Sequence, residues 1–192
     1  LTLAKELAGV TPKGLDSIFF TNGGAEATDS ALKLSMSYTG RSAVIAFMGS
    51  FHGRTVGATS ITGSNSKYRK HYNPLMGNVY FSPYPSKDLC PEGMPAEERA
   101  DYCLWELKKL LQYIVWPEDV ACIYMEPVMG EGGYVVPDKK FVQGVADICK
   151  QYGILLIFDE IQSGFGRTGK MWASQHFDVV PDIMTVGKAI AG

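Results

Sequence analysis

Short apolar runs alternate with longer amphipathic stretches along the chain, and this alternation constrains the fold more than any other feature. Runs that are apolar throughout are typical of strands covered on both faces of a sheet. We expect strands at residues 17–20, 43–47, 78–81, 121–126, 154–159 and 182–186. We expect helices at residues 24–38, 97–115 and 138–152, and another amphipathic helix within residues 1–10. Strand and helix in repetition predict an α/β fold, a mostly parallel sheet with helices on both faces.

The chain indicates one folding unit over residues 1–192. Its length and its hydrophobic content of 46% are enough for a sizeable core. A proline-rich connection over residues 84–98 is expected to run along the surface. Neither a linker nor an internal repeat divides the chain.

Charge and hydropathy exclude several classes of partner. With 18 Lys and Arg against 20 Asp and Glu, there is no basic excess to bind a nucleic acid. No apolar run approaches the roughly 18 residues of a membrane helix, and the first residues lack signal-peptide features. We therefore expect no membrane partner and a cytoplasmic location.

The four cysteines predict buried free thiols and no metal site. None of them forms a CxxC pair, and no histidine completes a zinc spacing. They are Cys90, Cys103, Cys122 and Cys149.

Glycines and polar residues gather directly after the expected strands, and the chain holds 21 glycines. Carboxyl ends of parallel strands meet at one edge of a sheet, where ligands bind. We therefore expect a site at this edge, built from TNGGAEA (21–27), GSFHGRT (49–55), EPVMGEGG (126–133), DEIQSG (159–164) and GK (187–188).

Three positions at this edge suggest a particular chemistry. The helix expected to begin at Gly24 can bind a phosphate at its positive end, although it can also be a simple helix start. Asp159 ends the most apolar strand. A carboxylate there can hold a protonated ring nitrogen, coordinate Mg²⁺, or form a structural ion pair with an arginine. Lys188 follows a strand and a glycine, where an amine is either a nucleophile or a solvated surface group. A phosphate cradle, an acid and a lysine together suit pyridoxal 5'-phosphate.

A competing motif is rejected. GFGRTGK (164–170) matches the core of a phosphate-binding P-loop, but Met171 stands where Ser or Thr should bind Mg²⁺. The acidic strand also precedes this loop, which reverses the usual order.

The sequence resembles the class III (omega-amino acid) pyridoxal-phosphate aminotransferases. The resemblance is carried by five motifs in the family's order: FFTNGGAEATDSALKL, GSFHGRT, EPVMGEGG, IFDEIQSGFGRTGK and TVGKAIAG. It implies the large cofactor-binding domain of fold type I, incomplete here because an N-terminal segment and a C-terminal domain lie outside the chain. It also implies a homodimer with sites at the interface. Gly23 departs from the family, since many members have Ser there.

The resemblance assigns several residues to the cofactor. Gly24 and Ala25 would donate backbone N–H groups to its phosphate. Phe51 would stack on the pyridine ring with His52 beside it. Ile161 would pack on the opposite face of the ring.

The remaining assignments concern chemistry and substrate. Asp159 would pair with the ring nitrogen, Gln162 would reach the phenolic oxygen, and Lys188 would form the Schiff base. Arg54 matches an arginine that binds the substrate carboxylate in some members. Glu126 matches a glutamate that pairs with a second, downstream arginine in several members.

The function implied is transamination through Lys188. An amino group would move from an omega-amino acid, similar to 4-aminobutyrate or ornithine, to a 2-keto acid. A racemase, an aminomutase or a decarboxylase on the same scaffold stays open, because these motifs do not separate the reactions. A third alternative is an inactive fragment or a binding remnant.

Overall fold

The computed structural model describes residues 2–191; Leu1 and Gly192, the last residue of the TVGKAIAG motif, lie outside this range. Its centre is a five-stranded sheet in the order β2-β1-β3-β4-β5, and every pairing is parallel. The strands are β1 (Ala43–Phe47), β2 (Val79–Ser82), β3 (Val120–Met125), β4 (Leu155–Asp159) and β5 (Ile183–Thr185). The structure confirms these five expected strands, with ends shifted by no more than one residue.

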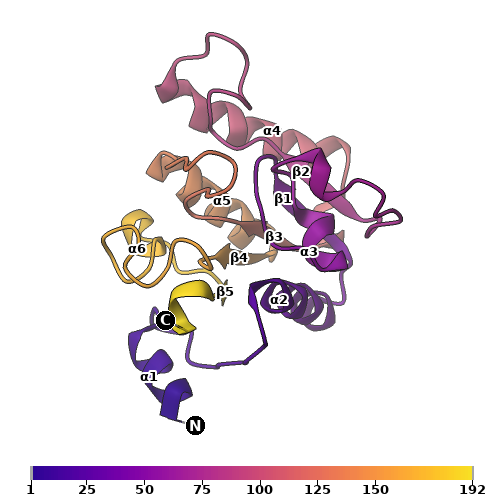
Figure 1. Cartoon of the computed structure of the whole chain (residues 1–192). Helices are drawn as coiled ribbons and strands as arrows, with labels where there is room; N and C mark the ends of the chain where they lie inside the picture. The colour runs from indigo at the N-terminus through magenta and orange to yellow at the C-terminus, as the bar shows by residue number, and fades with distance from the viewer. Residues whose placement is uncertain (1, 192) are drawn as a thin grey trace.

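Helices cover both faces of the sheet, as expected (Figure 1). The helices are α1 (Thr2–Val10), α2 (Gly24–Thr39), α3 (Val56–Ile61), α4 (Arg99–Tyr113), α5 (Lys139–Tyr152) and α6 (Ser174–Phe177), and those against the sheet are α2, α3, α4 and α5. Successive side chains of a strand point to opposite faces. Ile45 and Phe47 therefore pack with α4 and α5, whereas Val44 and Ala46, which alternate with them, pack with α2 and α3. Among residues 2–191, no helix is long and apolar enough to cross a membrane.

Short 3-10 helices occupy several connections: η1 (Ser66–Tyr68), η2 (Ala96–Glu98), η3 (Pro117–Asp119) and η4 (Lys188–Ala191). The helix expected over residues 97–115 is thus η2 followed by α4. The boundaries of α5 follow its sequence closely. The Asp138 side chain accepts the N–H of Lys140 at its start, and Gly153, at a φ of 61°, ends it in the left-handed conformation.

Residues 17–20 are not a strand, and that prediction was wrong. The segment runs extended between α1 and α2, away from the sheet (Figure 1). Phe19 is 80% exposed and Phe20 is 52% exposed. An apolar, aromatic run favours extended backbone, but a strand also requires a paired neighbour. In residues 2–191, no strand pairs with this segment.

The connection over residues 84–98 is only partly a surface segment. Tyr84 is fully buried, packs edge-on against Phe47 and Phe141, and donates its hydroxyl to the carbonyl of Glu126. The four cysteines are free and buried, as expected.

The chain order of the strands explains where ligands can bind. β1 and β3 are neighbours, although β2 comes between them in sequence. The connection after β1 carries α3 on one face, and the connection after β3 carries α5 on the other. The carboxyl ends of such a strand pair open onto a crevice. The loops after β1, β3, β4 and β5 all reach this edge.

Candidate functional site

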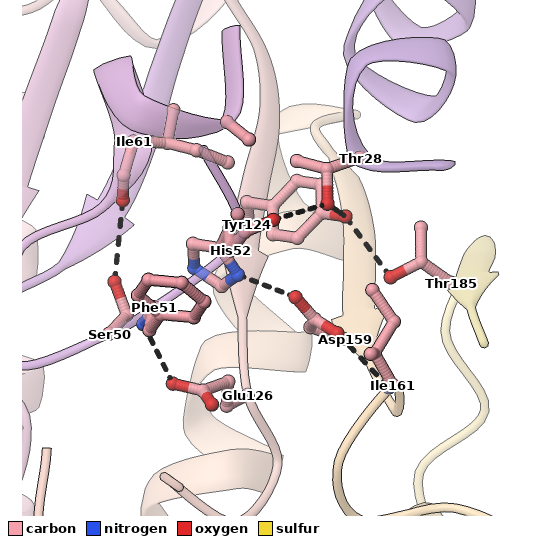
Figure 2. A network of polar contacts seen from close by, with 12 residues as sticks. Thr28, Ser50, Phe51, His52, Ile61, Tyr124, Glu126, Asp159, Ile161 and Thr185 are labelled. Atoms are coloured by element: carbon pink, nitrogen blue, oxygen red, sulfur yellow. Dashed lines mark hydrogen bonds and ion pairs between the residues drawn. The ribbon is translucent and has the colours of Figure 1, made fainter. Parts of the chain in front are cut away.

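Asp159, the last residue of β4, is buried at the carboxyl edge of the sheet. Its Oδ2 atom lies 2.7 Å from Nδ1 of His52, and its Oδ1 atom accepts the N–H of Ile161 at 3.1 Å. Figure 2 shows this arrangement, with His52 reaching Asp159 from the loop after β1. A buried carboxylate needs such donors, because burial without them costs several kcal/mol, roughly 2–7 for a polar group. The structure therefore brings together His52 and Asp159, two residues that the sequence assigned separately to the cofactor site.

His52 is itself held on several sides. Its backbone N–H donates to Thr62 Oγ1 at 3.0 Å, and its carbonyl accepts from Thr28 Oγ1 at 2.9 Å. Its ring meets the Tyr124 ring edge-on, with 4.6 Å between centroids. The Tyr124 hydroxyl bonds both Thr28, at 3.2 Å, and Thr185, at 3.1 Å (Figure 2).

This supporting network was missed by sequence reasoning. Burial raises the pKa of the Tyr124 hydroxyl well above its ordinary value, so it stays a neutral hydrogen-bonding group. Tyr124 reads as an ordinary core residue of an apolar strand, and Thr28 as an ordinary helix residue. Thr28 and Thr185 lie inside the quoted motifs FFTNGGAEATDSALKL and TVGKAIAG, but the motifs do not show that both bond the Tyr124 hydroxyl.

Glu126 follows β3 and is also buried. Its carboxylate accepts the N–H of Phe51 and the N–H of Gly130, both at 3.2 Å. Burial raises the pKa of Glu126 to about 7; the charge of His52 opposes this rise, and that of Asp159 adds to it. In residues 2–191, no cation forms an ion pair with Glu126. Its visible role is to hold the loops after β1 and β3 together.

The start of α2 lies beside the loops that follow β4 and β5. No side chain caps the helix at Gly23, so its first N–H groups have no side-chain acceptor there. A Cβ atom on Gly24 would lie 2.9 Å from Cδ1 of Ile161. A Cβ atom on Gly187 would lie 3.3 Å from Cγ2 of Ile161 and 3.8 Å from Cα of Gly24. Gly24 and Gly187 therefore pack closely against Ile161, two residues after Asp159. The backbone at Gly24 and Ala25 thus begins α2 at the same edge of the sheet as Asp159.

Lys188 comes directly after Gly187 and opens η4 with an exposed side chain. Its φ of 47° is uncommon for a residue with a side chain, and such conformations cluster at functional sites. Its strand, β5, pairs with β4, and Thr185 is in register with Asp159. In residues 2–191, no hydrogen bond or ion pair joins Lys188 to Asp159.

Four further predicted residues come from the loops after β1 and β4. Phe51 and Ile161 are drawn on either side of Asp159 in Figure 2. Gln162 is half-buried, and its Cγ atom lies 3.2 Å from where a Cβ on Gly130 would be. Arg54 is exposed, and its guanidinium carbon lies 5.9 Å from the centroid of the Tyr68 ring.

The loop after β4 is not a phosphate-binding P-loop, in agreement with the sequence reading. Residues 164–170 form turns, and no helix begins at Lys170. The fully buried Glu160 closes this loop instead. Its carboxylate accepts the Ser163 hydroxyl at 2.7 Å and the N–H groups of Ala173 and Ser174 at 2.9 and 2.8 Å.

The site combines an uncapped helix start, a buried carboxylate held by an imidazole, and an exposed lysine after the adjacent strand. Such a donor set can bind a phosphate, hold a protonated ring nitrogen and offer an amine. Within residues 2–191, no three His, Cys, Asp or Glu side chains gather as metal ligands.

Comparison with known proteins agrees with this donor set. The family pattern described as Aminotransferase class-III matches residues 1–192. The chain is 43% identical over 192 residues to a "Probable 4-aminobutyrate aminotransferase" of Bacillus subtilis (strain 168), covering 100% of this chain and 44% of that protein. It is 36% identical over 196 residues to an "Alanine/serine racemase" of Pyrococcus horikoshii, covering 100% of this chain and 41% of that protein.

A solved structure shows the same fold. The (S)-enantioselective omega-transaminase from Thermomicrobium roseum superimposes with a TM-score of 0.89 at 34% identity, over 96% of this chain and 42% of that one. The chain thus spans less than half the length of the relatives it matches. The fold is that of the fold type I pyridoxal-phosphate transaminases, and the chain belongs to the class III aminotransferase family.

Proposed function

We propose that this chain is part of the large domain of a pyridoxal-phosphate-dependent transaminase, which moves an amino group from an omega-amino acid to a 2-keto acid. The observation that carries the proposal is the buried Asp159–His52 pair beside the uncapped start of α2, with Lys188 after the adjacent strand. The donor was expected to resemble 4-aminobutyrate or ornithine, and that choice remains a prediction.

The residues at the edge fit this cofactor. Gly24 and Ala25 would donate their N–H groups to its phosphate, where the helix dipole favours negative charge. Asp159 would hold a proton on the ring nitrogen, and Gln162 would donate to the phenolic oxygen. When bound, the cofactor supplies an electron sink for the bond broken at the substrate Cα. Lys188 would bind it covalently through Nζ.

Two apolar side chains would orient the ring. Phe51 would stack on one face, and Ile161 would pack on the other. His52 would keep the Asp159 carboxylate in place through the 2.7 Å contact. Phe51 and Ile161 would also exclude water from the two faces of the ring. The attraction between the Asp159 carboxylate and the protonated ring nitrogen would then be stronger.

Lys188 has a second role once its amine is free. Nζ would take the proton from the substrate Cα as a general base and return it to the cofactor carbon as a general acid. Arg54 would bind a substrate carboxylate. Glu126 would pair with a second arginine from downstream of this chain.

Racemisation is the second candidate, because the "Alanine/serine racemase" relative matches this whole chain. The two reactions would use the same Lys188 and Asp159. Amine transfer that depends on a keto acid supports transamination, whereas loss of optical activity without a keto acid supports racemisation. An aminomutase or a decarboxylase would show neither result.

The decisive experiment tests cofactor and lysine together. The full-length enzyme is incubated with pyridoxal phosphate, its visible spectrum is recorded, and borohydride reduction is followed by peptide mapping. We expect a visible band and a label on Lys188. Lys188→Ala should abolish turnover, and Asp159→Asn should reduce the rate by at least about 100-fold while cofactor still binds. A label scattered over surface lysines, or substantial turnover by Lys188→Ala, would overturn the proposal.

The remaining predictions concern the whole protein. A homodimer with interfacial sites and a cytoplasmic location follow from the resemblance and the sequence. We expect the isolated 192-residue chain to be poorly soluble or inactive, because Phe19, Tyr38 and other apolar side chains are exposed on it. A soluble, active monomer of this length would contradict this.

A further inference from the structure

Tyr68, a residue of η1 that the motifs do not include, connects three segments near the candidate site. Its ring meets the Phe51 ring edge-on, with 5.1 Å between centroids. Its hydroxyl donates to Oε1 of Glu131 at 2.7 Å, in the loop after β3. The guanidinium carbon of Arg54 lies 5.9 Å from the centre of the same ring. Tyr68 therefore links the loops that follow β1 and β3.

The surroundings of Arg54 leave its charge available. In residues 2–191, no carboxylate lies within ion-pair distance of Arg54. An arginine already paired with a protein carboxylate would be neutralised and would bind a second carboxylate poorly. An aromatic ring instead holds a guanidinium through its face and leaves the five N–H donors unused. The contact with Tyr68 thus orients Arg54 without occupying it.

The hydroxyl contact restrains the ring. Tyr68 is half-buried, and its η1 segment lies on an extended connection between α3 and β2. Glu131 provides a charged acceptor, and hydrogen bonds to charged groups are stronger than neutral ones. With Phe51 on one edge and Glu131 at the hydroxyl, the ring has little freedom to turn away from Arg54. Lys67 adds a second cation, with Nζ 4.9 Å from the ring centroid.

We infer that Tyr68 is a positioning residue that determines specificity: its ring holds Arg54 in place to bind substrates that carry a carboxylate. This inference rests on the proposed function, because Arg54 is there assigned to the substrate carboxylate. Substrates without a carboxylate do not use Arg54 and should be insensitive to Tyr68.

The test compares two kinds of ligand in the full-length enzyme loaded with cofactor. Pentanoate, a carboxylate that cannot react, is titrated by its effect on the visible spectrum. Kinetics are measured with a carboxylate-bearing amino donor and with 1-phenylethylamine, an amine without a carboxylate. The variants are Tyr68→Leu, which removes the ring, and Tyr68→Phe, which keeps the ring but removes the bond to Glu131. Tyr72→Leu is the matched control, an exposed tyrosine of the same segment.

Tyr68→Leu should raise the Kd of pentanoate and the KM of the carboxylate donor about fivefold, the size expected for one cation–π contact. Tyr68→Phe should raise both about twofold. The kcat of each variant and the KM for 1-phenylethylamine should stay within about twofold of the unsubstituted enzyme. Combining Tyr68→Leu with Arg54→Ala should add nothing to Arg54→Ala alone, since both remove the same interaction.

Three results would overturn the inference. An equal loss with both kinds of donor would mean that Tyr68 acts only through folding. Unchanged pentanoate binding in Tyr68→Leu, or in Arg54→Ala, would mean that Tyr68 does not position a carboxylate-binding arginine. Borohydride labelling of Lys188 keeps the two proposals apart. Its persistence in all variants leaves the proposed function standing, and its absence from the unsubstituted enzyme overturns that function first.

Discussion

Asp159 and His52 share a buried contact of 2.7 Å although 107 positions separate them in the chain. Asp159 is 4% exposed, and His52 is 2% exposed. The contact fixes the end of β4 to the loop after β1. Because the other Asp159 oxygen accepts the N–H of Ile161, the carboxylate is held at both oxygens.

Replacing His52 with phenylalanine should separate this support from the fold. The variant keeps a ring against Tyr124 but removes the Nδ1 donor, which costs about 1.5–3 kcal/mol at a charged partner. The kcat should therefore fall about 10- to 100-fold, while borohydride still labels Lys188. His176→Phe, at an exposed histidine, should leave kcat unchanged. Equal kcat for His52→Phe and the unsubstituted enzyme would contradict the role of the contact.

Glu126 should make stability depend on pH. Its pKa is raised from 4.5 to about 7 in the folded protein, so the folded state binds more protons than the unfolded state between these values. Stability contributed by the protonated carboxyl is present below about pH 4.5 and is lost as pH rises through about 7. The resulting change in the free energy of unfolding is on the order of 3 kcal/mol.

Melting temperatures of the cofactor-free enzyme at pH 5 and pH 8 measure this effect. Glu126→Gln should gain stability relative to the unsubstituted enzyme as pH rises from 5 to 8, because the amide cannot ionise. The exposed Glu118→Gln should show no such trend. Parallel pH profiles for Glu126→Gln and the unsubstituted enzyme would contradict a pKa of about 7 and would fit the pairing of Glu126 with the second arginine, whose charge lowers the pKa of the carboxyl.

Glu160 should be essential to the loop that carries Ile161 and Gln162. Glu160→Ala leaves the Ser163 hydroxyl and the N–H groups of Ala173 and Ser174 without their acceptor. Each buried donor left without an acceptor costs about 1–3 kcal/mol of stability. We expect a lower melting temperature and faster tryptic cleavage after Arg167 and Lys170.

The control for this prediction is Glu118→Ala, at an exposed carboxylate. It should cleave at the same rate as the unsubstituted enzyme. If Glu160→Ala also resisted trypsin to the same extent, the loop would be held by its other contacts, such as the buried Trp172 ring.

Most of the fold could be predicted because its signals are local. An apolar run buried on both faces, such as residues 43–47, is visible in the sequence, and so are the cap at Asp138 and the stop at Gly153. The run at residues 17–20 is also largely apolar, but no strand pairs with it in residues 2–191, and pairing is not a local property. The prediction of a surface segment failed at Tyr84 for a similar reason. The prolines around Tyr84 indicate a loop, but they do not show which side chains the loop buries.

The candidate site divides in the same way. Asp159 and Lys188 were predictable because the end of a strand is a position that sequence can locate. Tyr124 and Tyr68 were not, because neither is a motif residue and both act through contacts with residues distant in sequence. No role was predicted for Glu160, which follows Asp159 directly. A second carboxylate after an apolar strand does, however, suggest a buried group with several hydrogen-bond donors.

The first turn of α2 offers a matched pair of glycine substitutions. A Cβ on Gly24 would lie 2.9 Å from Cδ1 and 3.2 Å from Cγ2 of Ile161, so Gly24→Ala must push that side chain aside. A Cβ on Gly23 meets nothing within 4 Å, and its extended φ of −170° suits any residue. Gly24→Ala should raise the Kd of pyridoxal phosphate several-fold, about 3- to 10-fold for a strain of roughly 1 kcal/mol. Gly23→Ser should bind it equally or more tightly, because Ser is a better N-cap and adds a hydroxyl beside the phosphate position.

Adding Ile161→Val to Gly24→Ala distinguishes steric strain from a general effect on the helix. Valine lacks the Cδ1 atom, so the closest approach disappears and the Kd should fall back toward that of Ile161→Val alone. Fluorescence titration of the apoenzyme with pyridoxal phosphate measures all five proteins, including the unsubstituted one. If Gly23→Ser weakened binding as much as Gly24→Ala, or if Ile161→Val gave no relief, the close approach of α2 to the loop after β4 would not control the cofactor site.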